Sequence, residues 1–181
     1  MKNADILAII PARVNSKGIP LKNFKDLAGG PSTVQRAMLC AELTGCDPII
    51  VSTDLVDSER FAGSPVQWLR RPLELVQDDT PMQAVVEHAL AAVPGPPDQI
   101  ILLVQPTQPL REPKHLRAAI ELLEQHDLGS VISVVETEPV EKLLTLPWGE
   151  QSILEPHNPE LPMTAVRELR QACLATYRRD G

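Results

Sequence analysis

One feature constrains this chain more than any other: a run of five apolar residues followed by a basic loop. Residues 6–10 (Ile-Leu-Ala-Ile-Ile) show no polar alternation, so we expect a strand covered on both faces, as in a parallel α/β sheet. Ligands of such sheets bind at the carboxyl ends of the strands. Gly18 lets the backbone approach a ligand closely. Through residue 25 the loop carries no acidic residue, so we expect it to hold a phosphate chain. Its four cations are Arg13, Lys17, Lys22 and Lys25.

The overall charge makes this basic loop more informative. The 181 residues include 24 acidic and 17 Lys or Arg side chains, giving a net charge of −7. An acidic protein that binds an anion has to concentrate positive potential locally. The negative charge and the 3% aromatic content both argue against nucleic-acid binding. A hydrophobic content of 43% is enough for one domain with an aliphatic core.

The cysteines and the apolar segments point to an ordinary cytoplasmic protein. Three cysteines, without any Cys-x-x-Cys spacing, indicate neither a disulfide framework nor a thiolate metal site. No apolar run approaches the ~20 residues that span a bilayer. The N-terminus also lacks a signal-peptide pattern. We therefore expect a cytoplasmic location and no membrane partner.

Strand-like segments alternate with helical ones along most of the chain. This alternation predicts an α/β fold with a doubly wound, mainly parallel sheet and helices on both faces. The first helix should begin at Pro31-Ser32 and the third after Pro113. The second should span residues 80–93, with Thr80-Pro81-Met82-Gln83 as a capping box. We expect strands at residues 6–10, 48–52, 66–69, 99–104 and 130–135.

The basic loop carries a long and specific sequence motif. Residues 10–23 read Ile-Pro-Ala-Arg-x-x-Ser-Lys-Gly-Ile-Pro-x-Lys-Asn, and this resembles the opening motif of the acylneuraminate cytidylyltransferases, also called CMP-sialic acid synthetases. Val14-Asn15 replaces the usual Gly-Gly or Ser-Gly pair. The resemblance runs along the whole chain and is strongest over residues 6–135. Further matches follow in the family's order at residues 51–54, 71–75, 78–81, 103–111, 130–135, 170–171, 177 and 180–181.

The resemblance implies a Rossmann-like, three-layer nucleotidyltransferase domain. Residues 1–135 would form the nucleotide-binding core. Residues 136–181 would form an extension that covers the sugar site and makes dimer contacts, so a homodimer is implied. Prolines break up residues 136–162, where we expect loop. Residues 165–178 have the spacing of an amphipathic helix, whereas the family has loop and strand there, and both alternatives stay open.

The implied reaction transfers CMP from CTP to an acidic sugar, sialic acid or a related nonulosonate, and releases pyrophosphate. Arg13 and Lys22 would stabilise charge on the phosphate oxygens. Arg71 could instead be a surface arginine paired with Glu74 or Asp78, and Asp54 is assigned no catalytic role. The expected nucleotide contacts are Ala12, Arg13, Ser16, Lys17, Asn23, Arg71 and Thr80. The expected sugar contacts are Gln105, Thr107 and Arg170.

Magnesium is the cofactor that the resemblance implies. The family carries an Asp-x-Asp motif for this metal beyond the point that corresponds to Gly181, and the 181 residues contain no such motif. We therefore expect no protein metal site, a metal held mainly by the nucleotide's phosphates, and slow or absent turnover. The four histidines do not form a metal-ligand spacing.

Two other functions remain open. One is a synthetase for Kdo or another related acid, because the sugar contacts lie in the weaker part of the resemblance. The other is a non-catalytic nucleotide-binding or dimerisation module. A phosphate-loop kinase is disfavoured because no Gly-x-x-x-x-Gly-Lys-Ser/Thr sequence is present, and the Gly-x-Gly-x-x-Gly dinucleotide fingerprint is missing too.

Overall fold

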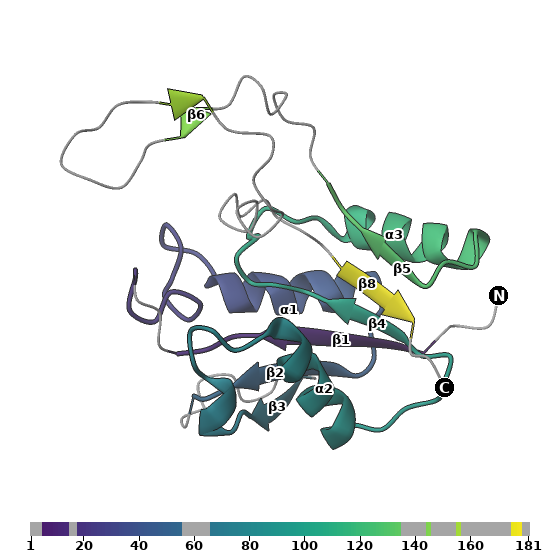
Figure 1. Cartoon of the computed structure of the whole chain (residues 1–181), viewed down its shortest axis with the longest axis horizontal. Helices are drawn as coiled ribbons and strands as arrows, with labels where there is room; N and C mark the ends of the chain where they lie inside the picture. The colour runs from purple at the N-terminus through teal and green to yellow at the C-terminus, as the bar shows by residue number, and fades with distance from the viewer. Residues whose placement is uncertain are drawn as a thin grey trace. The chain divides into compact units, whose positions relative to one another are not determined.

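The computed structural model describes residues 5–14, 18–55 and 66–134, together with the backbone of short strands at 144–145, 155–156 and 175–178. The chain divides into two compact units, Met1–Ser133 with Leu174–Gly181, and Val134–Cys173. The first unit contains the sheet and the helices (Figure 1). No helix among the described residues is long and apolar enough to cross a membrane.

A six-stranded sheet in the order β3-β2-β1-β4-β8-β5 forms the centre of the first unit. Neighbouring strands are parallel from β3 to β4, while β8 pairs antiparallel with both β4 and β5. The predicted α/β fold with a mainly parallel sheet is confirmed, although β5 ends three residues earlier than expected. The strands are β1 (Ile6–Pro11), β2 (Ile49–Thr53), β3 (Gln67–Arg70), β4 (Ile100–Leu103), β5 (Ser130–Ile132) and β8 (Ala175–Arg178).

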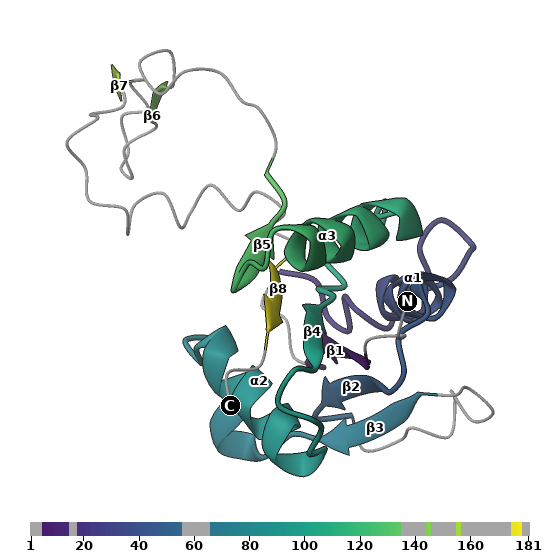
Figure 2. The ribbon, with the colours of Figure 1, turned by 90° about the vertical axis from the view of Figure 1, so that its right-hand side faces the viewer.

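Helices cover both faces of this sheet (Figure 2). Ala8 and Ile10 of β1 belong to a core shared with α1 (Thr33–Thr44) and α3 (Pro113–Gln125). Leu7 and Ile9 belong to a second core, shared with α2 (Met82–Ala92). All four side chains are fully buried. Successive strand residues point to opposite faces, so an unbroken apolar run serves two cores at once, as the sequence predicts.

Local capping determines where α1 begins. The Ser32 hydroxyl accepts a hydrogen bond from the Gln35 backbone N–H at 3.4 Å, and the Gln35 side chain accepts one from the Ser32 N–H at 2.8 Å. This is a capping box, and it confirms Ser32 as a helix-initiating residue. The third helix begins at Pro113, also as predicted.

The expected capping box of the second helix is wrong. This helix begins at Met82 with Pro81 as its N-cap, and no side chain caps it. The Thr80 N–H instead donates to the Gln77 carbonyl at 3.3 Å, which places Thr80 in the preceding turn. The Gln83 amide donates forward to Glu87 at 2.8 Å rather than back to the cap. The turn before the helix therefore overrides the capping sequence.

Two short strands lie in the proline-rich stretch where we expected loop. Strands β6 (Leu144–Thr145) and β7 (Glu155–Pro156) pair with each other in antiparallel orientation. Strand β8 excludes the helical alternative for residues 175–178, because their backbone pairs with β4 on one side and β5 on the other. Pairing with two strands overrides the local helical spacing. The remainder of residues 165–178 lies outside the described residues.

Candidate functional site

The register of the sheet brings the ends of four parallel strands level with one another. Pro11 lies opposite Ser52, and Ser52 lies opposite Leu69. On the other side of β1, Ile9 lies opposite Leu103. Because β2 and β4 flank β1, the connections that follow β1 and β4 diverge here, which makes this edge the topological switch point where α/β sheets bind ligands.

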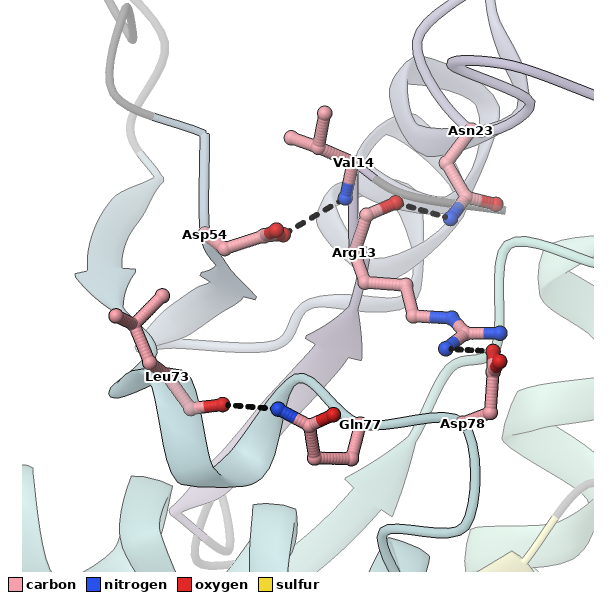
Figure 3. Close-up of polar contacts among 7 residues, drawn as sticks. All are labelled: Arg13, Val14, Asn23, Asp54, Leu73, Gln77 and Asp78. Carbon is pink, nitrogen blue, oxygen red and sulfur yellow. Dashed lines mark hydrogen bonds and ion pairs between the residues drawn. The ribbon is translucent and has the colours of Figure 1, made fainter. Parts of the chain in front are cut away.

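The backbone on both sides of Arg13 is held by hydrogen bonds (Figure 3). The Ala12 N–H donates to the Ser52 carbonyl at 2.9 Å, and the Val14 N–H donates to Asp54 Oδ1 at 2.7 Å. From the other side, Asn23 Nδ2 donates to the Arg13 carbonyl at 3.1 Å. The loop after β1 is therefore fixed to the end of β2 and to the segment that leads into α1.

The Arg13 side chain crosses the edge to the turn that follows the 3-10 helix η2 (Leu73–Leu75). Its Nη1 lies 2.6 Å from Asp78 Oδ1, and the two side chains are 31% and 40% exposed. In the same turn, Gln77 Nε2 donates to the Leu73 carbonyl at 3.1 Å. Arg13 is thus within reach of a ligand but is already paired with a carboxylate.

Arg71 is buried, with 6% of its surface exposed. Its N–H donates to the Thr53 carbonyl at 2.7 Å, and its guanidinium donates to the Ser52 carbonyl at 2.8 Å and to Ser52 Oγ at 3.2 Å. Burial lowers the pKa of Arg71, Asp54 opposes this shift, and Arg13 adds to it. The alternative of a surface arginine paired with an acid is wrong, because this side chain is buried against Ser52.

Lys22 and Asn23 lie in the turn before α1. Lys22 is half-buried, and it forms no ion pair among the described residues. Asn23 is 6% exposed, and its Oδ1 is a buried acceptor without a hydrogen-bond partner. Buried polar atoms are usually hydrogen-bonded, so an unpaired acceptor at a ligand-binding edge indicates a place for a donor.

The remaining predicted site residues differ in accessibility. Ala12 is fully buried, and its N–H donates to the Ser52 carbonyl. Thr80 is half-buried. After β4, Gln105 is half-buried and Thr107 is exposed. Three predicted contacts lie outside the described residues: Ser16, Lys17 and Arg170.

Three residues that the sequence interpretation left without a site role shape this edge. Asp54 accepts a hydrogen bond from the Val14 N–H, and Asp78 pairs with the Arg13 side chain. Arg111 binds the carbonyl of Gln105 at 3.0 Å. Asp54 follows a buried strand directly, which is a signal that could have placed it at the edge. The partners of Asp78 and Arg111 become evident only in the folded chain.

The described residues do not fit a protein-held magnesium ion. None of their His, Cys, Asp and Glu side chains form a group of three or more that could hold a metal. Asp54 already accepts from the Val14 N–H, and Asp78 is paired with Arg13. A hard divalent cation needs several oxygen ligands at once. The described residues by themselves therefore supply no set of oxygen ligands that would hold Mg²⁺.

The parallel sheet with a cationic, hydrogen-bonded loop at its switch point defines an α/β domain of the class that binds ligands at the carboxyl ends of its strands. Residues 7–147 match the sequence model of the family described as Cytidylyltransferase, so the chain belongs to that family. This confirms the resemblance on which the sequence interpretation rests.

Two relatives are similar to most of this chain. It is 35% identical over 144 residues to the CMP-N,N'-diacetyllegionaminic acid synthase of Legionella pneumophila, covering 75% of this chain and 58% of the relative. It is 36% identical over 131 residues to the N-acylneuraminate cytidylyltransferase of Oncorhynchus mykiss, covering 72% of this chain and 30% of the relative. The chain therefore spans between about a third and three fifths of these relatives' length.

A solved structure shares the fold. The CMP:2-keto-3-deoxy-manno-octonic acid synthetase, solved in complex with CTP, superposes with a TM-score of 0.62 at 16% sequence identity. The match covers 97% of this chain and 75% of that structure. A nucleotidyl transferase from Methanothermobacter matches with a TM-score of 0.51 at 24% identity. Both comparisons support the predicted Rossmann-like nucleotidyltransferase fold.

Proposed function

We propose that this chain carries out CTP-dependent cytidylyl transfer to an acidic sugar of the sialic acid type, with release of pyrophosphate. The observation that carries the proposal is the arrangement around Arg13: its carbonyl is held by Asn23 and its guanidinium reaches across the switch point. The printed activities of the two relatives, a synthase of CMP-N,N'-diacetyllegionaminic acid and an N-acylneuraminate cytidylyltransferase, support the substrate class.

The phosphate chemistry falls to Arg13 and Lys22. In the proposed reaction the sugar's anomeric hydroxyl attacks the α-phosphorus while the bond to pyrophosphate breaks, so charge on the phosphate oxygens has to be stabilised. The planar fork of Arg13 can span two oxygens, and the Lys22 ammonium is a mobile point charge that can follow the leaving pyrophosphate. Ser16 and Lys17 would add contacts from the same loop.

The nucleoside would be held by groups whose positions are already fixed. Asn23 offers Oδ1 as an acceptor, because its Nδ2 is used by the Arg13 carbonyl. Arg71 is fixed by Ser52 and lies beside the same loop. Ala12 would contribute its carbonyl and Thr80 its hydroxyl.

The acidic sugar would bind on the β4 side of the edge. Gln105 and Thr107 offer an amide and a hydroxyl for sugar oxygens, and Arg170 would pair with the carboxylate. We further propose that residues 136–181 contribute to the sugar site and to a homodimer, that the protein acts in the cytoplasm, and that Mg²⁺ arrives with the nucleotide's phosphates. Residues 1–135 would be the nucleotide-binding core.

Calorimetric titration with CTP, UTP, ATP and GTP tests the nucleotide assignment. We expect CTP to bind most tightly, and equal affinities would mean that only the phosphates are recognised. CMP-sugar formation is then assayed with N-acetylneuraminate, legionaminate and Kdo as separate acceptors. Turnover with Kdo alone would favour the related-acid alternative. Binding of CTP without turnover on any acid would favour the non-catalytic module.

A further inference from the structure

Arg111 closes the loop that carries Gln105. Its Nη2 donates to the Gln105 carbonyl at 3.0 Å and to the side-chain oxygen of Gln108. The backbone of the loop forms two successive turns, since the Gln108 N–H donates to Gln105 at 3.4 Å and the Arg111 N–H donates to Gln108 at 3.2 Å. The Arg111 guanidinium therefore connects both turns. It also fixes the backbone at Gln105, from which the Gln105 side chain extends.

The Arg111 guanidinium lies in surroundings that are unfavourable for a positive charge. Burial lowers the pKa of Arg111, and its Nε is a buried donor without a hydrogen-bond partner. Among the described residues no carboxylate forms an ion pair with it. The Cys40 thiol of α1 donates to its carbonyl at 3.8 Å, which ties the loop to the helix layer. A neutral side chain could close a turn without the cost of burying a charge, so the positive charge itself needs an explanation.

We propose that Arg111 is a positioning residue for the acidic sugar: it fixes the backbone from which Gln105 extends at the sheet edge, and it adds close to Gln105 a positive charge that no carboxylate among the described residues pairs with. The guanidinium acts through Gln105 and through its charge, and it need not touch the substrate. This inference rests on the proposed cytidylyl transfer. It predicts that binding of the acid, but not of CTP, depends on Arg111, which is not among the predicted substrate contacts.

The test compares four variants of the full chain by steady-state kinetics. Arg111→Met should raise the KM for N-acetylneuraminate about tenfold, the effect expected from losing one charged hydrogen bond, while the KM for CTP changes less than about twofold. Arg111→Lys should recover part of the loss. Gln108→Glu keeps the acceptor but neutralises the cation, so it too should raise the KM for the acid. Arg117→Met, a matched change on α3, should leave both constants unchanged.

The contrary outcomes are distinct. An Arg111→Met protein with both KM values unchanged, or with both raised equally and no recovery in Arg111→Lys, would overturn the proposal in favour of a structural role. If Arg111→Met does not fold, Arg111→Lys and Gln108→Glu decide by the same criterion. If the unmodified chain binds CTP but forms no CMP-sugar, as expected for a chain without the metal motif, NMR titration with N-acetylneuraminate decides the inference; if it does not bind CTP either, the proposed function fails and the same titration still decides the inference. A shift of the Gln105 side-chain amide in the unmodified chain that Arg111→Met abolishes supports it, and no shift overturns it.

Discussion

The Arg13 guanidinium lies 2.6 Å from the Asp78 carboxylate, so the cation best placed for a triphosphate is paired with an acid of the same chain. The pair is 31% and 40% exposed, and exposed pairs contribute only about 0.2 to 1 kcal/mol. A phosphate can bind the arginine through two charge-assisted hydrogen bonds, which are stronger. We therefore expect the nucleotide to displace Asp78 rather than to be excluded by it.

Asp78→Asn should tighten CTP binding by about 1.4- to fivefold, because the competing pair and its ~0.2 to 1 kcal/mol are removed. Titration calorimetry at low salt measures this change. Asp79→Asn is the control, since it makes the same charge change one residue away and should tighten binding less. If Asp78→Asn weakens binding instead, the carboxylate contributes to the site and does not compete for it.

Lys22→Ala should weaken CTP binding by ~1.5 to 3 kcal/mol, the range for hydrogen bonds to charged groups, and leave the melting temperature nearly unchanged. Lys22 forms no ion pair with another described residue, so its loss costs the fold little. Lys25→Ala is the matched comparison: Lys25 is an exposed lysine of the same loop, and its loss should weaken CTP binding less than the loss of the half-buried Lys22. A Lys22→Ala protein that melts early yet binds CTP normally would contradict the role assigned to this lysine.

Arg71→Lys should lower the free energy of unfolding by ~1.5 to 3 kcal/mol, because an ammonium cannot replace both guanidinium hydrogen bonds to Ser52 while the charge stays buried. Urea denaturation followed by circular dichroism measures the loss. Arg70→Lys is the control: the adjacent arginine is exposed, and its change should stay within about 0.5 kcal/mol. Equal losses for the two variants would show that the Ser52 contacts contribute nothing.

Burial, with a smaller effect of Cys40, raises the pKa of the Cys46 thiol from 9.0 to about 12. The folded state thus holds this proton more tightly than the unfolded state, so its contribution to stability is complete below pH 9 and is lost as the pH rises towards 12. Between pH 8 and 10.5 the unmodified chain should lose about 2 kcal/mol more unfolding free energy than Cys46→Ala, at ~1.4 kcal/mol per unit above pH 9. Urea titrations at the two pH values test this, and equal losses would show that the thiol titrates normally when folded.

Neighbouring residues were enough to predict several elements. The unbroken apolar run of β1 predicted a strand with two covered faces, because burial on both faces requires no polar alternation. Ser32 predicted the start of α1, because the capping box joins residues three apart in the chain. The cations of the β1 loop predicted a site at the carboxyl end of the strand, since that position follows from the order of strand and loop.

Other features depend on partners distant in sequence. The spacing of residues 165–178 suited a helix, but residues 175–178 form a strand because β4 and β5 offer their backbones on either side. Thr80 had the sequence of a helix cap, but its N–H donates to Gln77 in the preceding turn. In both cases hydrogen bonds formed in the folded chain outweigh the local preference.

The sequence by itself determined the α/β class, the family, and the loop that carries the charge. Only the tertiary structure decided which groups oppose or support that charge: Asp78 facing Arg13, Asn23 holding its carbonyl, and Arg111 closing the Gln105 loop. Each of these contacts depends on side-chain geometry or on turns that meet at one sheet edge. Composition and spacing specify the elements, whereas hydrogen bonds of about 3 Å exist only once the strands' register has aligned their ends.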